Sequence, residues 1–268
     1  MTFGWGGVSL PDGWSPSVLS HKESEECLTP MGITSENVAA DFGISRETQD
    51  KFAAESFLKA AAAQKAGKFK HEIVPVKVTV VDPKTKKAIE VVVDADDGIR
   101  EGVTAESLSK LKPSFKQDGS THAGRPILIL NDFCPCNSVE CLPGNASQVS
   151  DGAAAVVLTR RSVAKRLGLP IIGKYVAAAV VGVPPRIMGV GPAYAIPKVL
   201  EKTGLSKDDV DFYEINEAFA SQAIYSVNKL GIPFAKVNLN GGAIAIGHPL
   251  GCSTSLSLSL SFVSFTLP

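Results

Sequence analysis

The sequence lacks the long apolar run and the excess of one charge that mark several classes of protein. No apolar run approaches the roughly 20 residues that span a bilayer. The first residues, MTFGWGGVSLPDG, lack the basic-then-apolar order of a signal peptide. Lysine plus arginine equals aspartate plus glutamate, 27 of each, so no overall basic field favours nucleic acid or an anionic membrane. We therefore expect an intracellular protein with a small ligand, and with no membrane or nucleic-acid partner.

Cysteine is also scarce and unevenly placed. There are five cysteines: Cys134, Cys136 and Cys141 crowd into one short segment, while Cys27 and Cys252 stand alone. An odd, clustered set is not a disulfide framework. The C-x-C-x4-C spacing also differs from the paired C-x2-C sets of structural zinc sites. We expect neither a disulfide framework nor a metal site.

What is present indicates a globular chain. With 268 residues, of which 44% are hydrophobic, there is room for one large or two modest domains. Thr34 or Ser35 is predicted to cap a short helix that ends at Ala40, and Ser45 to begin a longer helix that Gly67 ends. The alternating segments EIVPVKVTVV and AIEVVVD around DPKTKK predict a hairpin, and TAESLSKL predicts a short helix.

From Pro170 onward the predicted order is βαβαβ. The predicted strands are 171–183, 210–215 and 236–246, and the predicted helices are 191–204 and 216–231. Such alternation indicates an α/β fold with parallel pairings and ligands at the carboxyl ends of the strands. The motifs EINEAF and GHPLG both lie at such ends.

Two polar side chains at these strand ends are candidates for a site. His248 lies between Gly247 and Pro249 in a glycine-rich turn, where the backbone can approach a ligand closely. Asn216 follows a predicted buried strand and can present its amide to a ligand or an ordered water. The alternatives left open by these residues alone are a histidine satisfied within an ordinary turn and an asparagine that caps a helix.

Five motifs together point to one family. NEAFA, NGGAIAIGHPLG, MGVGPAYAIP, MGITSENVA and NASQVSDGAAAVVL occur in the order and approximate spacing of thiolases. From Cys27 to Gly251 the chain resembles this family, especially its peroxisomal 3-ketoacyl-CoA members. The resemblance implies an incomplete thiolase-like α/β fold, made of a loop domain and a partial C-terminal βαβαβ layer. It also implies acyl transfer in fatty-acid β-oxidation, in which a 3-ketoacyl-CoA and coenzyme A give acetyl-CoA and a shortened acyl-CoA. Coenzyme A is then a substrate, and no cofactor is permanently bound.

The resemblance assigns roles to individual residues. His248 matches the histidine that activates the nucleophilic cysteine and helps to bind the thioester oxygen, and Asn216 matches the asparagine that holds a water at that oxyanion site. The coenzyme A contacts implied by the family are Ser147 at the pantetheine, Met31 and Met188 at the thioester channel, Arg100 at the nucleotide end, and Phe115, Ala123, Ala218 and Phe219 at the walls. Taken singly, the methionines and Phe115 are more typical of core residues, and Arg100 is more typical of a solvated charge.

The sequence also departs from the family pattern. Nothing like the family's QCSSG is found before MTFGWGG, and STSLSLSLSFVSFTLP stands where a CIGTGMG-like loop is expected. We therefore expect both the nucleophilic and the acid/base cysteine to be absent, and the apolar faces left open to make the chain poorly soluble alone. Residues 125–144 look inserted and are expected to push Ala123 and Ser147 apart. The predicted division is a non-matching segment 1–26, a loop domain 27–124, the insertion 125–144, the last strand and helix of the N-terminal domain 145–169, a partial C-terminal domain 170–251 and a non-family tail 252–268.

The leading functional hypothesis is a thiolase-family acyltransferase whose 268-residue chain does not itself catalyse thiolysis. The alternative is a non-catalytic protein that binds coenzyme A or an intact thiolase subunit. An unrelated nucleotide-binding protein is disfavoured because no GxGxxG follows the first strand. The expected partners are acyl-CoA or coenzyme A and further thiolase subunits, in a homo-oligomer or a mixed assembly. The resemblance implies the peroxisome, with the cytosol as the alternative because no terminal SKL is present.

Overall fold

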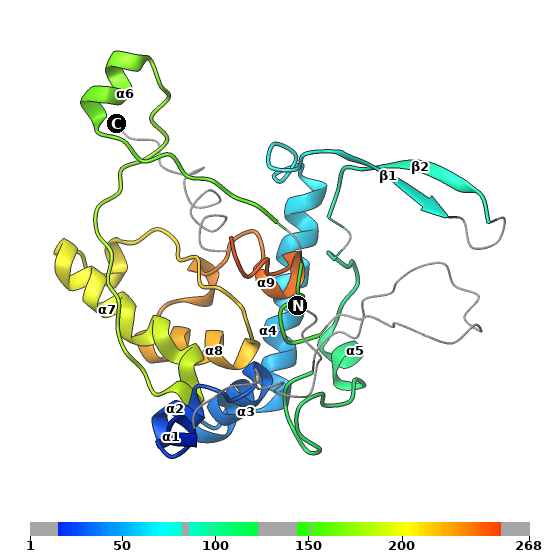
Figure 1. Cartoon of the computed structure of the whole chain (residues 1–268), viewed down its shortest axis with the longest axis vertical. Coiled ribbons are helices and arrows are strands. Elements are labelled where there is room, and N and C mark those ends of the chain that lie inside the picture. The colour runs from blue at the N-terminus through cyan, green and yellow to red at the C-terminus, as the bar shows by residue number, and fades with distance from the viewer. Residues whose placement is uncertain (1–15, 82–85, 97, 123–143, 151, 253–268) are drawn as a thin grey trace.

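Helices dominate the computed structural model, which describes residues 16–81, 86–96, 98–122, 144–150 and 152–252 (Figure 1). Within these ranges the helices and strands follow one another in the order α1 (Pro16–Leu19), α2 (Lys22–Glu26), α3 (Met31–Asp41), α4 (Arg46–Lys65), β1 (Val76–Val81), β2 (Ala88–Val93), α5 (Ala105–Ser109), α6 (Arg161–Leu167), the 3-10 helix η1 (Pro185–Val190), α7 (Gly191–Thr203), η2 (Lys207–Asp209), α8 (Ala220–Leu230), η3 (Phe234–Lys236) and α9 (Ala243–Ile246). None of the described helices is long and apolar enough to cross a bilayer.

Helix α4 is the centre of the main core. Its Ala53, Phe57 and Ala60 recur every three or four residues, so they share one face, and all three are completely buried. Ile224 of α8 and Ile244 of α9 belong to the same buried cluster. Burying one such large apolar side chain contributes roughly 1.5–3 kcal/mol. Packing on α4 therefore holds together helices that are far apart in the sequence.

Both ends of α4 agree with the prediction. The Ser45 hydroxyl accepts a hydrogen bond from the Thr48 amide at 3.2 Å, which satisfies one of the unpaired donors of the first turn. Gly67, just beyond the last turn, adopts φ +73°, a conformation that suits glycine.

The start of α3 differs from the prediction. The helix begins at Met31 behind Pro30, one turn earlier than expected, so Thr34 and Ser35 lie inside it and cap nothing. The Ser35 hydroxyl instead lies 2.7 Å from the Thr121 hydroxyl and 2.7 Å from that of Ser221. These buried bonds compete with the capping role, because they draw the hydroxyl into the interior.

The predicted hairpin is confirmed. Strands β1 and β2 pair antiparallel, with Val76 opposite Val93 and Val81 opposite Ala88. Most of their side chains are exposed on both faces. In Figure 1 the hairpin projects away from the helices.

The second half of the chain confirms the two predicted helices but not the three predicted strands. Helices α7 and α8 form. Of the predicted parallel sheet, the described residues show one bridge between the predicted strands 210–215 and 236–246, which joins Tyr213 to Val237. The Tyr213 amide donates to the Lys236 carbonyl at 2.7 Å, and the Asn238 amide donates to the Tyr213 carbonyl at 2.9 Å. A ladder needs neighbouring strands, and the described part of the chain offers residues 171–183 none, so this segment runs extended and unpaired.

Candidate functional site

Backbone hydrogen bonds bring the two predicted strand-end motifs together. The segment 145–150 lies between them: the Ser147 amide donates to the Ala218 carbonyl at 3.0 Å, and the His248 amide donates to the Gln148 carbonyl at 2.7 Å. Two isolated bridges, Ala146 with Phe219 and Val149 with His248, mark the same arrangement. The segment therefore aligns NEAF on one side with GHPLG on the other.

The two residues predicted to be catalytic meet at this junction. Asn216 Nδ2 lies 3.2 Å from His248 Nε2. An amide nitrogen can only donate, so Nε2 must accept, which requires a neutral ring with its proton on Nδ1. Burial also lowers the pKa of His248 below its ordinary value, which favours the same neutral form. The result is a neutral imidazole beside an exposed amide, a pair able to take a proton and to bind a carbonyl oxygen.

Gly247 allows the turn that carries His248. It adopts φ +108°, and a Cβ at this position would lie 2.6 Å from Ser150 Oγ. Both the backbone conformation and the close approach require glycine. The turn follows the short helix α9, not the strand expected from the sequence.

A cleft of about 650 Å³ opens beside the pair and includes Asn216, Gly247 and Pro249 in its lining. Glu214 lines it too, and burial, followed by repulsion from Glu217, raises the pKa of Glu214 to about 7. Burial and then Asp96 likewise raise the pKa of Glu72, which lies in the same lining. The cleft therefore holds carboxyl groups that resist ionisation next to the candidate site.

A buried polar network lies behind Asn216 and was not assigned a role from the sequence. Glu217 is 2% exposed and accepts hydrogen bonds from Ser56 Oγ at 2.6 Å, Asn238 Nδ2 at 2.7 Å and the Ile244 amide at 3.3 Å. One signal was available, since Glu217 shares a side with the buried Ile215 in an extended segment, and a carboxylate on a buried face must find donors.

Several residues assigned to the coenzyme A walls are close neighbours. The rings of Phe115 and Phe219 meet edge to face with centroids 6.3 Å apart. The Phe115 ring lies directly over Gly32, where a Cβ would be 2.1 Å from the ring, and Met31 precedes this glycine at 48% exposure. Ala218 stands beside Phe219 and bonds to Ser147 through its carbonyl. These contacts connect Phe115 with Phe219, and Ala218 with Ser147, close to the Asn216 motif in the sequence.

Met188 lies on η1, at 48% exposure. Its neighbour Gly189 packs against Gln222, whose Nε2 donates to the Asn216 carbonyl at 2.7 Å. The backbone next to Met188 is therefore linked to Asn216 through the Gln222 side chain. Ala123, the remaining predicted wall residue, lies outside the described residues.

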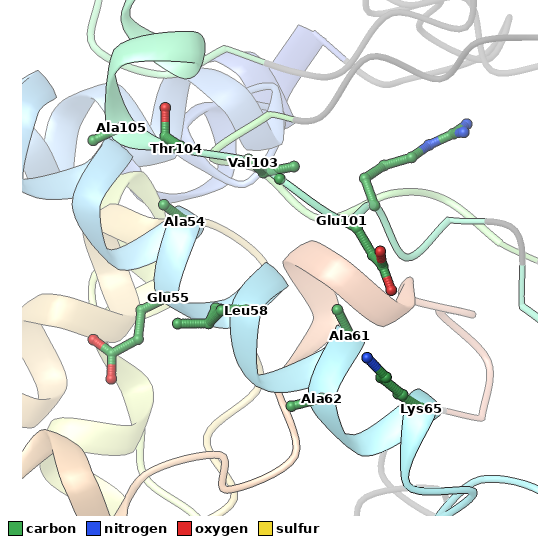
Figure 2. A pocket seen from close by; sticks show the side chains of 12 residues that line it. Ala54, Glu55, Leu58, Ala61, Ala62, Lys65, Glu101, Val103, Thr104 and Ala105 are labelled. Carbon is green, nitrogen blue, oxygen red and sulfur yellow. The ribbon is translucent and has the colours of Figure 1, made fainter.

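Arg100 lies away from these walls. It lines a separate hollow of about 730 Å³ between α4 and the loop 100–105. Figure 2 shows Leu58 and Ala61 of α4 and Val103 of the loop around this hollow. The Nε of Arg100 is buried without a hydrogen-bond partner among the described residues. The structure therefore does not place Arg100 in the cleft beside Asn216.

The flanks of the predicted insertion are held together. The His122 amide donates to Asn145 Oδ1 at 2.9 Å, and the Asn145 amide donates to the His122 carbonyl at 3.1 Å. Asp50 lies 2.7 Å from His122 Nε2 and accepts from Asn145 Nδ2 at 3.0 Å. The predicted separation of Ala123 and Ser147 involves Ala123, which lies outside the described residues, but their neighbours His122 and Asn145 are held together. Loop closure costs little more as a loop lengthens, and bonds to a buried aspartate offset that cost.

No metal site or disulfide appears in the described ranges. They contain no group of three or more histidine, cysteine or acidic side chains placed to hold a metal ion. Of the cysteines in these ranges, Cys27 is exposed and Cys252 is buried, and both are free thiols.

Sequence comparisons identify relatives of the whole chain. The family model for the thiolase N-terminal domain matches residues 12–132, and that for the thiolase C-terminal domain matches residues 169–262. A peroxisomal 3-ketoacyl-CoA thiolase of Yarrowia lipolytica is 57% identical over 240 residues, which is 90% of this chain and 53% of that protein. The peroxisomal 3-ketoacyl-CoA thiolase of Homo sapiens is 54% identical over 259 residues, 94% of this chain and 56% of that protein. The chain spans about half the length of these curated relatives.

Solved structures give the same answer for the fold. The dimeric peroxisomal thiolase of Saccharomyces cerevisiae superposes with a TM-score of 0.77 at 50% identity, covering 92% of this chain and 56% of that one. An acetyl-CoA acetyltransferase of Bacillus anthracis gives a TM-score of 0.72 at 38% identity, covering 86% of this chain and 52% of that one. The predicted α/β class and thiolase-like fold are therefore confirmed, the fold being partial relative to these proteins. On the evidence of both family models, the curated relatives and the shared fold, the chain belongs to the thiolase family.

Proposed function

We propose that this chain carries the oxyanion-binding part of a thiolase site that acts on a 3-ketoacyl-CoA and coenzyme A. The observation that carries the proposal is the 3.2 Å contact between Asn216 Nδ2 and His248 Nε2, beside a cleft that Asn216 lines. Two motifs from different parts of the chain supply the pair, and the curated relatives that match most of this chain are named as 3-ketoacyl-CoA thiolases. The reaction class is acyl transfer between thiols.

In this proposal the neutral His248 first acts as a base. Once Asn216 no longer donates to Nε2, a thiol gives its proton to that atom and the thiolate sulfur bonds to the 3-keto carbon of the substrate. The adduct then breaks the bond between this carbon and the acetyl-CoA carbon, so that the acyl group stays on sulfur and the electron pair moves onto the thioester oxygen of the leaving acetyl-CoA enolate. The imidazolium then donates its new N–H toward that oxygen, and Asn216 Nδ2 donates directly or through a water. One fixed donor beside such an oxygen lowers the barrier by roughly 3–4 kcal/mol. The lowered pKa of His248 keeps the ring ready to accept the proton near neutral pH.

We further propose that the 268-residue chain binds acyl-CoA but does not complete thiolysis alone. Neither family cysteine motif occurs in its sequence, and neither Cys27 nor Cys252 follows a strand at the start of a helix, the context that activates a thiol. The alternative, a non-catalytic protein that binds coenzyme A or a thiolase subunit, shares this binding step and differs in having no acyl transfer at all.

Incubation with a 3-ketoacyl-CoA followed by intact-mass measurement tests this proposal. We expect saturable binding of the acyl-CoA, weakened by His248→Ala and by Asn216→Ala, with no acyl adduct on cysteine and no release of acetyl-CoA. In a second experiment, a thiolase subunit that contains the family cysteines is added to the chain. Acetyl-CoA release above that of the added subunit alone would indicate a site shared by the two chains. An adduct or turnover by the chain alone would contradict the proposed inactivity, and no binding would contradict the proposed site.

The remaining assignments stay predictions. We propose Ser147 as a contact of the pantetheine and Arg100 as a contact of the nucleotide end. We propose Met31 and Met188 as contacts of the thioester channel. The proposed walls are Phe115, Ala123, Ala218 and Phe219. We also propose the predicted domain division, assembly with thiolase subunits and a peroxisomal location, the location named for the curated relatives. Phe219→Ala should weaken acyl-CoA binding if the walls are assigned correctly.

A further inference from the structure

The space behind Asn216 and His248 is filled by a buried polar network that joins α4, the NEAF segment, the loop before α9 and α9 itself. Its members are Ser56, Glu217, Asn238 and the backbone amides of Gly242 and Ile244. The segment that carries Asn216 and the helix that precedes His248 are both hydrogen-bonded within this network. The network therefore lies where it can control the distance between the two functional groups.

Asn238 holds the chain on the N-terminal side of Asn216. Its Oδ1 accepts from the Ile215 amide at 2.8 Å, and its Nδ2 donates to the Ile215 carbonyl at 2.8 Å and to Glu217 Oε1 at 2.7 Å. Asn238 is 2% exposed and has φ +46°, a conformation that asparagine tolerates better than most residues. These bonds fix the orientation of the amide, because turning it over would oppose like groups at Ile215.

Ser56 connects the network to α9. Its hydroxyl donates to Glu217 Oε2 at 2.6 Å and accepts from the Gly242 amide at 3.0 Å. The Ile244 amide, in the first turn of α9, donates to the same carboxylate oxygen at 3.3 Å. The helix ends at Ile246, two residues before His248, so its position sets where the imidazole begins.

Glu217 is the residue that both sides share. Its three partners, Ser56, Asn238 and the Ile244 amide, all donate to it. The Asn238 amide is oriented by its bonds to Ile215, the Ser56 hydroxyl by its bond from Gly242, and the Ile244 amide by the backbone of α9. A carboxylate, which only accepts, satisfies all of them at once. A glutamine in the same place must turn its NH₂ toward either Asn238 Nδ2 or the donors Ser56 and Ile244, which places donor against donor.

We propose that Glu217 is a positioning residue, held by Ser56 and Asn238, that sets the contact between Asn216 and His248. This inference rests on the proposed function, because the contact matters only if the pair binds a thioester oxygen. In this proposal Glu217 acts through the backbone on both sides of the pair.

The test uses NMR of the full chain labelled with ¹⁵N at histidine, with the His248 ring signals assigned from a His248→Gln variant. Ser56→Ala, Glu217→Gln and Asn216→Ala are compared with Ser226→Ala. Ser226 is an equally buried helical serine whose hydroxyl, among the described residues, bonds only to the Gln222 carbonyl of its own helix, at 2.9 Å, so it is a matched control. We expect Ser56→Ala and Glu217→Gln to move the Nε2 signal of His248, because the contact with Asn216 lengthens, while Ser226→Ala leaves this signal at its wild-type position.

The outcomes separate the two proposals. If Asn216→Ala shifts the His248 signals but Ser56→Ala and Glu217→Gln only lower the melting temperature, the positioning role is overturned and the proposed site stands. If Asn216→Ala also leaves the His248 signals unchanged, the pair does not form in solution and both proposals are overturned. Should Glu217→Gln fail to fold, the milder Ser56→Ala against Ser226→Ala decides the question by itself.

Discussion

The helices around α4 and the segment 152–184 are both rich in apolar residues but have opposite environments. Phe57 and Ile224, in the helices, are at most 1% exposed, whereas Val157 and Val180, in the segment, are 84% and 93% exposed. In Figure 1 the segment that carries α6 extends away from the helical body. Apolar composition alone therefore did not decide burial; the presence of a partner surface did.

Hydrogen bonding separates the two regions in the same way. The helices satisfy their own backbone, so they can pack with whatever apolar face is available. The strand pattern of 171–183 needs neighbouring strands, and among the described residues its amides donate no backbone hydrogen bond. The difference teaches that a helix is a locally complete unit, while a strand is only part of one.

The strongest way to test this comparison is one substitution made in both regions. Ile224→Ala removes a side chain that is 1% exposed, and Ile172→Ala one that is 64% exposed. We expect Ile224→Ala to lower the free energy of unfolding by about 2–5 kcal/mol, because it leaves a cavity, and Ile172→Ala to change it by less than about 0.5 kcal/mol. Urea unfolding measures both. Equal losses would show that the segment is packed in solution.

Adding one methyl group gives the next largest effect. A Cβ at Gly242 would lie 2.2 Å from the carboxyl carbon of Glu217, whereas one at Gly182, in the extended segment, would meet nothing within 4 Å. We expect Gly242→Ala to cost about 1–3 kcal/mol through overpacking, and Gly182→Ala to be nearly neutral. Thermal unfolding of the pair measures the contrast, and a neutral Gly242→Ala would mean that the network behind Asn216 is loose.

The pH dependence of stability tests the environment of Glu214, which lines the cleft beside the helices. The pKa of Glu214 is raised to about 7, so the folded chain holds a proton that the unfolded chain releases near pH 4.5. This contribution to stability is complete below about pH 4.5 and is lost as the pH rises through about 7. Allowing for partial exposure, we expect Glu214→Gln to remove a decline of the order of 1–2 kcal/mol between these values. Urea titrations of both proteins across this range measure it; identical profiles would contradict the shift.

The smallest expected effect compares the starts of two helices. Ser45 caps α4 through its hydroxyl, whereas Ser162, exposed in the first turn of α6, follows an N-cap residue that makes no side-chain cap bond. Ser45→Ala should cost about 1 kcal/mol, and Ser162→Ala less than about 0.5 kcal/mol. Denaturant midpoints at fixed m-value provide the measurement. A larger loss of stability for Ser162→Ala than for Ser45→Ala would contradict the capping role of Ser45.

Local signals predicted much of the fold and part of the site. Ser45 and Gly67 marked the ends of α4, and alternation marked the hairpin, because each depends on neighbours in the sequence. The start of α3 was placed one turn late, because the hydroxyls of Thr34 and Ser35 are used inside the structure and not at a cap. In the site, Asn216 and His248 were found from their motifs, and the structure places them together.

The amino-acid sequence by itself determined the longer helices α4, α7 and α8, the pairing of β1 with β2, and which family motifs the chain carries. Only the tertiary structure decided that Ser56, Glu217 and Asn238 meet behind Asn216, and that His122 and Asn145 close across the predicted insertion. The physical reason is range: caps, turns and helical faces depend on residues a few positions apart. A buried carboxylate and a strand are satisfied by groups far away in the chain, and folding alone determines whether those groups come within reach.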